Sequence, residues 1–242
     1  MLLPIAGKPL ILHTLQRAKR AANVSRAIVA TDDERIFDAV SGAGETAVLT
    51  DKNHQSGSDR VAEVARDLPE NTIIVNVQGD EPLIPVSTIE TAVAAMLSDE
   101  SADIVTTCEK ITNADDVLNP NAVKVVTDAN NFALYFSRAP VPFPRDAANK
   151  HGNLENALKN APELLATFRK HTGLYVYRRE YLLKLTAMPQ SKLEKLESLE
   201  QLRALESGAR IKVVEVAESS IGVDTPADFE RVRRILETEG QT

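Results

Sequence analysis

The 242-residue sequence predicts an α/β fold with a mostly parallel, mixed sheet and helices on both of its faces. The first observation is that strand-like and helix-like runs alternate through the first half of the chain. This rhythm is typical of parallel strands joined by right-handed crossovers. The second is the continuous apolar run IIVNV, because a strand that is apolar on both sides lies between two layers of helices. The length suffices for one large domain, with or without a subdomain.

The elements of the first half follow from local signals. Pro9 suits the first turn of a helix, and the apolar residues after it recur at helical spacing. A β-branched strand, AIVAT, precedes a helix that starts with acids and ends at glycines. Ser58 or Asp59 is expected to open the next helix. The remaining predicted elements are the strand TAVLT, the helix DRVAEVARDL, the strand IIVNV, the helix VSTIETAVAAML and the strand DIVTTCE.

The second half is less regular. NAVKVVTD and FALYFSR are predicted to pair around a turn-rich connection. The prolines of APVPFPRD exclude regular structure, and the polar stretch AANKHGNLENALKNA is the best candidate for a mobile segment or lid. Ser191 and Glu194 form a capping box ahead of one long helix, LEKLESLEQLRALESG. The strands HTGLYVYR and IKVVEV and a last helix capped at Thr225 complete the prediction.

Composition excludes several classes of protein. A net charge of −7 argues against a general binder of nucleic acid or of acidic membranes, although a small polyanion could still be held by a few local charges. No window approaches the roughly 20 apolar residues of a membrane span. Cys108 is the lone cysteine, so it makes no internal disulfide and is expected to be a buried thiol of a cytoplasmic protein.

Two acids follow predicted strands. Asp80 lies in the turn QGDEP after the buried strand, at the carboxyl edge where open sheets bind ligands. Asp224 lies later, between a strand and a helix cap. Each could be an ordinary turn or cap residue, but together they suggest a shared site for Mg²⁺ and phosphate.

Other candidate residues lie in loops and on one helix. The loop HQSGSDR leads into a helix, and Arg60 in the first helical turn opposes the helix dipole, which hints at a nearby negative charge. His54 is expected to be a polar loop residue. Surface or core roles remain open for a further group of residues, which comprises Arg138, His171, Tyr175, Glu200 and Gln201.

Taken in order, several motifs resemble one family. ATDDERI, HQSGSDR, VNVQGDEPLIP, NPNAVKVV, ALYFSRAPVP, HTGLYVYRR, LESLEQLRAL and GVDTPADFERV are similar to the motifs of the 3-deoxy-manno-octulosonate cytidylyltransferases, also called CMP-Kdo synthetases. The resemblance covers nearly the whole chain. It implies a Rossmann-like nucleotidyltransferase fold with a smaller dimerisation subdomain, and a cytoplasmic homodimer.

The resemblance also implies a reaction, in which CTP and Kdo give CMP-Kdo and pyrophosphate for lipopolysaccharide synthesis. Kdo, CTP and Mg²⁺ are the implied ligands, without nucleic acid or membrane. Asp80 and Asp224 match the family's magnesium carboxylates, and the resemblance implies a catalytic role for both. The nucleotide side is matched by Gln55, Ser56, Gly57, Arg60 and Gln78. The sugar side is matched by Arg138, His171, Tyr175, Glu200 and Gln201.

The beginning of the chain departs from this pattern. The family starts with an apolar strand and a phosphate-binding turn, whereas this sequence starts at MLLPIAGKPL. The strand would lie in the middle of the sheet, so two neighbouring strands are expected to lack a ladder partner. A shortened record, a weakened enzyme and a non-catalytic homologue remain alternatives, as does a cytidylyltransferase for amino-Kdo or sialic acid.

One domain, 1–242, is expected to contain three parts. Residues 1–110 form the nucleotide-binding part, residues 111–190 the sugar-binding and dimerisation part, and residues 191–242 return to the main sheet. The segment 145–168 is longer than the resemblance leads us to expect.

Overall fold

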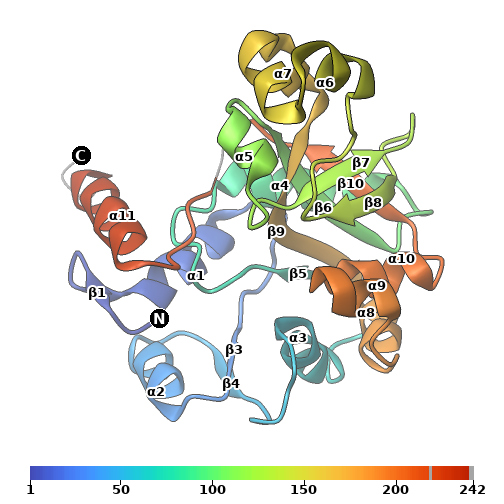
Figure 1. The fold of residues 1–242 in the computed structure, drawn as a ribbon. Coiled ribbons are helices and arrows are strands. Elements are labelled where there is room, and N and C mark those ends of the chain that lie inside the picture. Colours follow the sequence, from blue (N-terminus) through green and yellow to red (C-terminus); the bar gives the residue numbers. More distant parts are fainter. Residues whose placement is uncertain (218–219, 240–242) are drawn as a thin grey trace.

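In a computed structural model, which describes residues 1–217 and 220–239, the chain folds into the predicted mixture of sheet and helices (Figure 1). The first part alternates as expected. Pro9 is the N-cap of the first helix, and Asp33 caps the second by accepting a hydrogen bond from the Arg35 N–H. The elements here are β1 (Pro4–Ile5), β2 (Lys8–Pro9), α1 (Leu10–Arg20), β3 (Val29–Thr31), α2 (Glu34–Gly42), β4 (Ala47–Leu49), α3 (Gly57–Ala65) and α4 (Val86–Ser98).

The central sheet has six strands, in the order β10-β6-β9-β7-β8, with β5 also paired to β9. β10 and β6 are parallel, whereas β9 runs antiparallel to β5, β6 and β7, which makes the sheet mixed. Parallel β3 and β4 form a separate pair. The bounds are β5 (Ile73–Asn76), β6 (Ile104–Lys110), β7 (Lys124–Thr127), β8 (Ala133–Ser137), β9 (Arg169–Arg178) and β10 (Ile211–Glu215).

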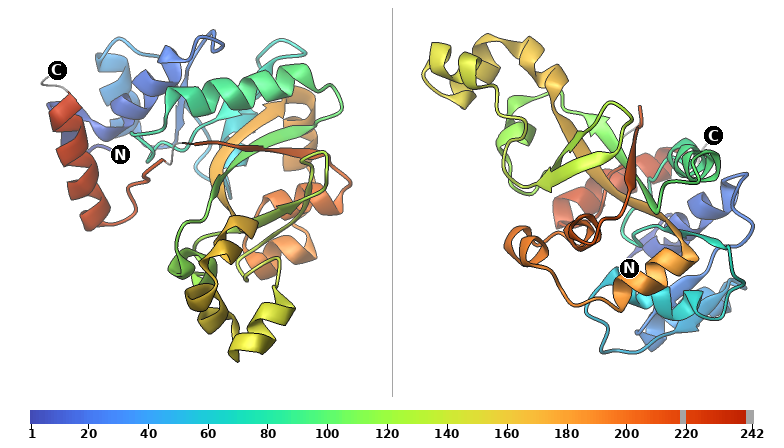
Figure 2. Two further views of the ribbon diagram at one scale, coloured as in Figure 1. Left: turned by 90° about the horizontal axis from the view of Figure 1, so that it is seen from above. Right: turned by 90° about the vertical axis from the view of Figure 1, so that its right-hand side faces the viewer.

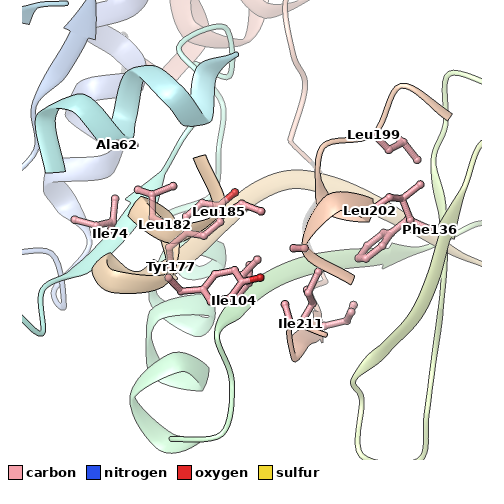
Figure 3. Close-up of a cluster of buried hydrophobic side chains, with 14 of the residues drawn as sticks. Ala62, Ile74, Ile104, Phe136, Tyr177, Leu182, Leu185, Leu199, Leu202 and Ile211 are labelled. Atoms are coloured by element: carbon pink, nitrogen blue, oxygen red, sulfur yellow. The ribbon is translucent and has the colours of Figure 1, made fainter. Parts of the chain in front are cut away.

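Helices cover both faces of this sheet, as predicted (Figure 2). Ile104 and Val105 are adjacent on β6 and therefore point to opposite faces. Ile104 packs into one core cluster with α3, α8 (Arg179–Thr186) and α10 (Gln201–Glu206), whose side chains Figure 3 shows. Val105 packs into a second cluster with α1 and α4. Burial on both faces fixes the register of the central strands.

The second half differs from the sequence-based expectation in two places. The proposed mobile segment is helical, with α6 (Arg145–His151), α7 (Leu154–Asn160) and the 3₁₀ turn η1 (Pro162–Thr167). These helices lie at the top of Figure 1, where Leu158 packs with Phe168 and Val117 of α5 (Ala114–Leu118) in a small core. These helices were not predicted, because the few apolar residues that pack into the small core stand in a mostly polar stretch.

The long helix expected after Ser191 is two helices, α9 (Lys192–Glu197) and α10, because Ser198 adopts φ +52° and ends the first. The capping box of Ser191 and Glu194 is present. The last helix is α11 (Pro226–Glu239). None of the helices that the structure describes is long and apolar enough to cross a bilayer.

Cys108 lies inside the core, as predicted. It is 4 % exposed on β6, and burial raises the pKa of its thiol to about 11. A thiol with so high a pKa is almost entirely protonated at neutral pH and is a poor nucleophile.

Candidate active site

The two predicted carboxylates are brought together. Asp80 follows β5, and Asp224 precedes α11, 144 positions later in the sequence. The N–H of Val223 donates to the carbonyl oxygen of Asp80 at 2.9 Å, which ties the two loops together. Burial raises the pKa of the Asp80 carboxyl, and the charge of Asp224 raises it further. Two acids that repel each other in this way form a site that favours a cation.

A third acid, Glu81, belongs to the same neighbourhood. Burial raises the pKa of its carboxyl, and the charges of Asp80, Asp224 and Glu109 contribute. Across the described ranges, no three His, Cys, Asp or Glu side chains are grouped closely enough to hold a metal ion. A cation at Asp80 and Asp224 would therefore need further oxygen ligands from a bound molecule and from water, which is the usual arrangement for Mg²⁺.

The start of α3 faces the end of β5. Ser56 is the N-cap and accepts from the Asp59 N–H, so the helix begins two residues earlier than predicted. A Cβ built on Gly57 would lie 4.0 Å from the Gln78 side-chain oxygen, which places these two predicted nucleotide-side residues next to each other. Unpaired N–H groups at a helix start attract anions and polar groups.

Arg60 has a partner that explains its place in the first turn. Its Nη2 donates to Asp32 Oδ2 at 2.9 Å, and its Nη1 donates to the hydroxyl of Thr50 at 2.5 Å. The negative charge expected near Arg60 is thus supplied by the protein. Gln55 is exposed and donates to the carbonyl oxygen of Asn53, and the imidazole of His54 contacts Glu63 in a local loop pair.

An irregularity in β9 shapes the other side of the site. Thr106 of β6 pairs with Tyr175, but the next residue, Thr107, pairs with Thr172. Gly173 and Leu174 therefore lie in a bulge without a partner on β6. Bulges of this kind redirect side chains and are common beside active sites. A Cβ built on Gly173 would lie 3.6 Å from Glu81 Oε1 and 3.8 Å from Gln78 Cγ, so the bulge lies against the QGDEP turn.

The hydrogen bonds of the Thr106 hydroxyl determine the tautomer of His171. The hydroxyl donates to the carbonyl oxygen of Leu174 at 2.8 Å, within the bulge. The hydroxyl has one proton, so the Nε2 of His171, 2.8 Å away, must be the donor in the second bond. Burial lowers the pKa of His171 to about 3. The ring is therefore neutral, and its Nδ1 presents a lone pair that can accept a hydrogen bond.

Aromatic rings surround His171. Its ring centroid is 5.1 Å from that of Phe136, in an edge-on contact, and 5.3 Å from that of Tyr175. Burial raises the pKa of Tyr175 well above its ordinary value. Tyr175 therefore stays a neutral hydroxyl throughout the physiological range. The row of rings holds the imidazole in one orientation.

Glu200 and Gln201 approach from the start of α10. Gln201 is only 6 % exposed, and its side-chain Nε2 has no hydrogen-bond partner in the described structure. A buried N–H₂ group without a partner costs about 1–3 kcal/mol, so its retention points to a function. Desolvation raises the pKa of Glu200, while a hydrogen bond from Ser58 lowers it and the charge of Asp59 raises it. Ser58 thereby links α10 to the start of α3.

Arg138 contacts the turn that precedes α10. Its Nε donates to the carbonyl oxygen of Glu197 at 2.6 Å, its Nη1 to that of Pro120 at 3.0 Å and its Nη2 to that of Ser198 at 3.3 Å. The structure thus places Arg138 against the turn that precedes α10. Each donor nitrogen already has a carbonyl partner, although each Nη carries a second N–H.

Some residues of the site were not identified from the sequence. Asp32 directly follows β3, and an acid at the end of a strand is a signal that could have identified it. Glu81 lies in the QGDEP turn, where no sequence pattern assigns it a functional role. Thr106 and Ser58 had no local signal, since their partners are 65 and 142 positions away.

A family model described as Cytidylyltransferase matches residues 1–211. The 3-deoxy-manno-octulosonate cytidylyltransferase of Geobacter sulfurreducens is 50 % identical over 228 residues, which is 94 % of this chain and 89 % of that protein. The protein of the same description from Geotalea daltonii is 49 % identical, over 98 % of this chain and 91 % of that one.

Solved structures agree. A structure of CMP:2-keto-3-deoxy-manno-octonic acid synthetase complexed with CTP superposes with a TM-score of 0.86 at 40 % identity, and the match covers 98 % of this chain and 91 % of that one. A putative glucose-1-phosphate thymidylyltransferase from Bacillus anthracis superposes with a TM-score of 0.62 at 13 % identity, a likeness of fold alone.

Proposed function

The chain belongs to the 3-deoxy-manno-octulosonate cytidylyltransferase family of nucleotidyltransferases, and on that premise we propose that it joins CTP and Kdo to give CMP-Kdo and pyrophosphate. The observation that carries this proposal is the convergence of three elements. The start of α3, the bulge of β9 and the Asp224 loop meet at the QGDEP turn, which carries Asp80. This arrangement offers a cation-favouring site between polar groups for a nucleotide and for a sugar.

The reaction requires the anomeric hydroxyl of Kdo to attack the α-phosphate of CTP while pyrophosphate leaves. Both substrates are anions, so neutralisation of charge and positioning supply most of the catalysis. The start of α3 and the Gln78 side chain lie together and are suited to the nucleotide. Arg60, paired with Asp32, orders this region.

The sugar side is proposed to consist of neutral donors and acceptors. The His171 Nδ1 can accept from a sugar hydroxyl, and the unpartnered Gln201 Nε2 can donate to a hydroxyl or carboxylate. Glu200 and Tyr175 add polar groups at the same end. Arg138 is proposed to act by holding the turn before α10, with its second Nη hydrogens directed to the sugar carboxylate in the bound state.

Asp80 and Asp224 fit Mg²⁺, because two hard carboxylate oxygens on linked loops leave room for phosphate oxygens and water. When bound, the ion would neutralise charge on the triphosphate and orient it toward the sugar. The two carboxylates themselves exclude an unneutralised triphosphate by repulsion, which makes nucleotide binding depend on the cation.

A homodimer in the cytoplasm, where CTP is available, is also proposed. Large apolar side chains are exposed on β8, on the following loop and on α9: Leu134 is 64 % exposed, Phe143 59 % and Leu196 80 %. β8 and α9 are joined by the hydrogen bond from the Ser137 hydroxyl to Glu197, at 2.8 Å. Light scattering on the purified protein is expected to give twice the chain mass, and a stable monomer at micromolar concentration would refute this part.

The enzymatic proposal is tested by measuring pyrophosphate release. The protein is incubated with Mg²⁺ and CTP, together with Kdo, its amino analogue or sialic acid in parallel, and ATP replaces CTP as the control. Release is expected with CTP and Kdo and is expected to be at least tenfold slower with the other sugars. Faster release with another sugar would reassign the substrate, and none with any sugar would refute the activity.

A further inference from the structure

The motif NPNAVKVV places a lysine inside the protein. Lys124 is the first residue of β7 and is 0 % exposed. Lysine is rarely buried so completely, because its ammonium group gives up its contacts with water. Burial lowers the pKa of this group and the positive charge of Arg138 lowers it further, while the charges of Asp116 and Glu197 raise it. An apolar side chain of the same length would avoid the cost of burying a charge, so the retained ammonium group points to a role.

Both described hydrogen bonds of the ammonium group hold one turn. The Lys124 Nζ donates to the carbonyl oxygen of Asn119 at 2.9 Å and to that of Ala122 at 2.6 Å. The Asn119 carbonyl oxygen also accepts from the Ala122 N–H at 3.1 Å, and the Asn119 side chain accepts from the Asn121 N–H at 2.9 Å. The turn formed by residues 119–122 is therefore tied to the buried ammonium group at its first and last residues.

The same turn binds Arg138. The carbonyl oxygen of Pro120, within the turn, accepts from the Arg138 Nη1 at 3.0 Å. The rest of the guanidinium group donates through Nε to the carbonyl oxygen of Glu197 and through Nη2 to that of Ser198. The guanidinium group thus bridges two turns, and three carbonyl oxygens determine the orientation of its plane. Lys124 supports one of these two anchors.

The pairing of β7 with β8 explains why these groups meet. The strands are antiparallel, and Lys124 at the start of β7 is opposite Ser137 at the end of β8. The 119–122 turn leads into β7, and Arg138 directly follows β8, so both lie at the same end of this strand pair. The Ser137 hydroxyl and the Arg138 N–H donate to the Glu197 carboxylate at 2.8 Å and 2.9 Å, which holds the backbone beside the guanidinium group.

From these contacts we propose that Lys124 is a positioning residue for the acidic sugar. It acts by holding the 119–122 turn, whose Pro120 carbonyl oxygen directs the guanidinium group of Arg138. This inference rests on the proposed function, in which Arg138 receives the sugar carboxylate. The planar fork of an arginine binds a carboxylate well only when its plane is correctly oriented, because the direction of each N–H bond is fixed within that plane. The buried ammonium group supplies this orientation without contact with the substrate.

Steady-state kinetics of Lys124→Met tests this role. Methionine keeps the length of the buried side chain but removes its donor. The KM for Kdo is expected to rise about tenfold, whereas kcat and the KM for CTP should stay within about twofold, because only the sugar carboxylate is held less well. The control Lys110→Met removes a lysine from the exposed end of β6 and should change none of these constants. An unchanged KM for Kdo, or an equal rise in both KM values, would overturn the proposal.

A double-variant cycle tests whether Lys124 acts through Arg138. Arg138→Lys keeps the charge but loses the fork of N–H donors, so it should itself raise the KM for Kdo. Addition of Lys124→Met to this variant should raise the KM by no more than about a further twofold, since the group that Lys124 holds is already absent. Two effects that multiply would place the action of Lys124 elsewhere and would overturn the proposal.

NMR of the arginine guanidinium groups gives a readout that needs no activity. The Arg138 signals are identified by their loss in Arg138→Lys. Rotation about the Nε–Cζ bond exchanges the two Nη groups and must break their bonds to Pro120 and Ser198. This exchange should be at least about tenfold faster in Lys124→Met than in the unmodified chain. An equal rate in both would overturn the proposal.

The two readouts separate the failure of this inference from that of the proposed function. Absence of pyrophosphate release by the unmodified chain would refute the function, and the exchange rate would still decide whether Lys124 holds Arg138. If Lys124→Met does not fold, Asn119→Ala loosens the same turn from an exposed position, because it removes the acceptor of the Asn121 N–H. It is expected to raise the KM for Kdo and the exchange rate at least threefold, and a variant that changes neither would overturn the proposal.

Discussion

The Nε2 of His171 donates to the Thr106 hydroxyl across 2.8 Å, and Thr106 in turn donates to the carbonyl oxygen of Leu174. A bulge in β9 accompanies this relay, because Leu174 lies at the position where the pairing with β6 shifts. The relay fixes the tautomer of a buried, neutral imidazole. The same bulge also brings Gly173 against the turn that carries Asp80.

His171→Gln is predicted to change how stability depends on pH. The pKa of His171 is about 3 in the folded protein and near 6.5 when unfolded, so the unfolded state binds more protons between these values. Stability should therefore fall as pH decreases from 6.5 toward 3, by roughly 2–4 kcal/mol from this group. Urea unfolding at several pH values should show a smaller fall in the variant, and parallel curves would show that His171 is not held neutral.

Gln201→Leu is predicted to raise stability and impair function. The substitution removes a buried N–H₂ group that has no partner, so the melting temperature should rise by a few degrees, or about 1 kcal/mol. The KM for Kdo should rise at least about tenfold, while the KM for CTP stays within about twofold. The control is Gln16→Leu, at an exposed position of α1, which should change neither quantity. A destabilised Gln201→Leu would mean that Nε2 is satisfied in solution.

Arg203→Met is predicted to be strongly destabilising. Arg203 and Glu194 form a buried ion pair, 9 % and 3 % exposed, in which Nε and Oε2 are 2.8 Å apart. Removal of the cation leaves the Glu194 charge buried without its partner and should cost about 3–5 kcal/mol in urea unfolding. The double variant Glu194→Gln with Arg203→Met keeps the capping box and should recover most of the loss. A double variant as unstable as the single one would assign the loss to packing.

Asp80→Asn and Asp224→Asn are each predicted to lower turnover with CTP and Kdo by about a hundredfold or more, since the cation loses one of two protein ligands. The melting temperature of Asp80→Asn should not fall, because the substitution relieves repulsion from Asp224. The control is Asp115→Asn, at an exposed position of α5. Activity near that of the unmodified chain at saturating Mg²⁺ would remove these two residues from the mechanism.

Much of this arrangement could be predicted from local sequence. The turn after a buried strand drew attention to Asp80 and the start of the last helix to Asp224, although no described strand ends at Asp224, and the capping box at Ser191 was present as expected. The positions of individual strands also held, because buried runs such as IIVNV have few alternatives. These features depend on residues close together in the chain.

The rest depends on contacts between distant residues. The antiparallel course of β9, its bulge at Gly173 and the burial of Gln201 follow from packing that no local pattern reports. The break at Ser198 went unnoticed because leucine spacing continues across it. The helices within the polar stretch 147–161 were not predicted, because its few apolar anchors, such as Leu158, stand among polar residues.

This chain is proposed to transfer the cytidylyl group to Kdo at the Asp80 and Asp224 site. The most direct measurement incubates the protein with Mg²⁺, Kdo and CTP labelled at the α-phosphate, and identifies the labelled product by chromatography and mass spectrometry. The label is expected to move from CTP to CMP-Kdo with the unmodified chain, and to move far more slowly with Asp224→Asn. Label that stays in CTP with folded protein, or equal transfer by Asp224→Asn, would contradict it.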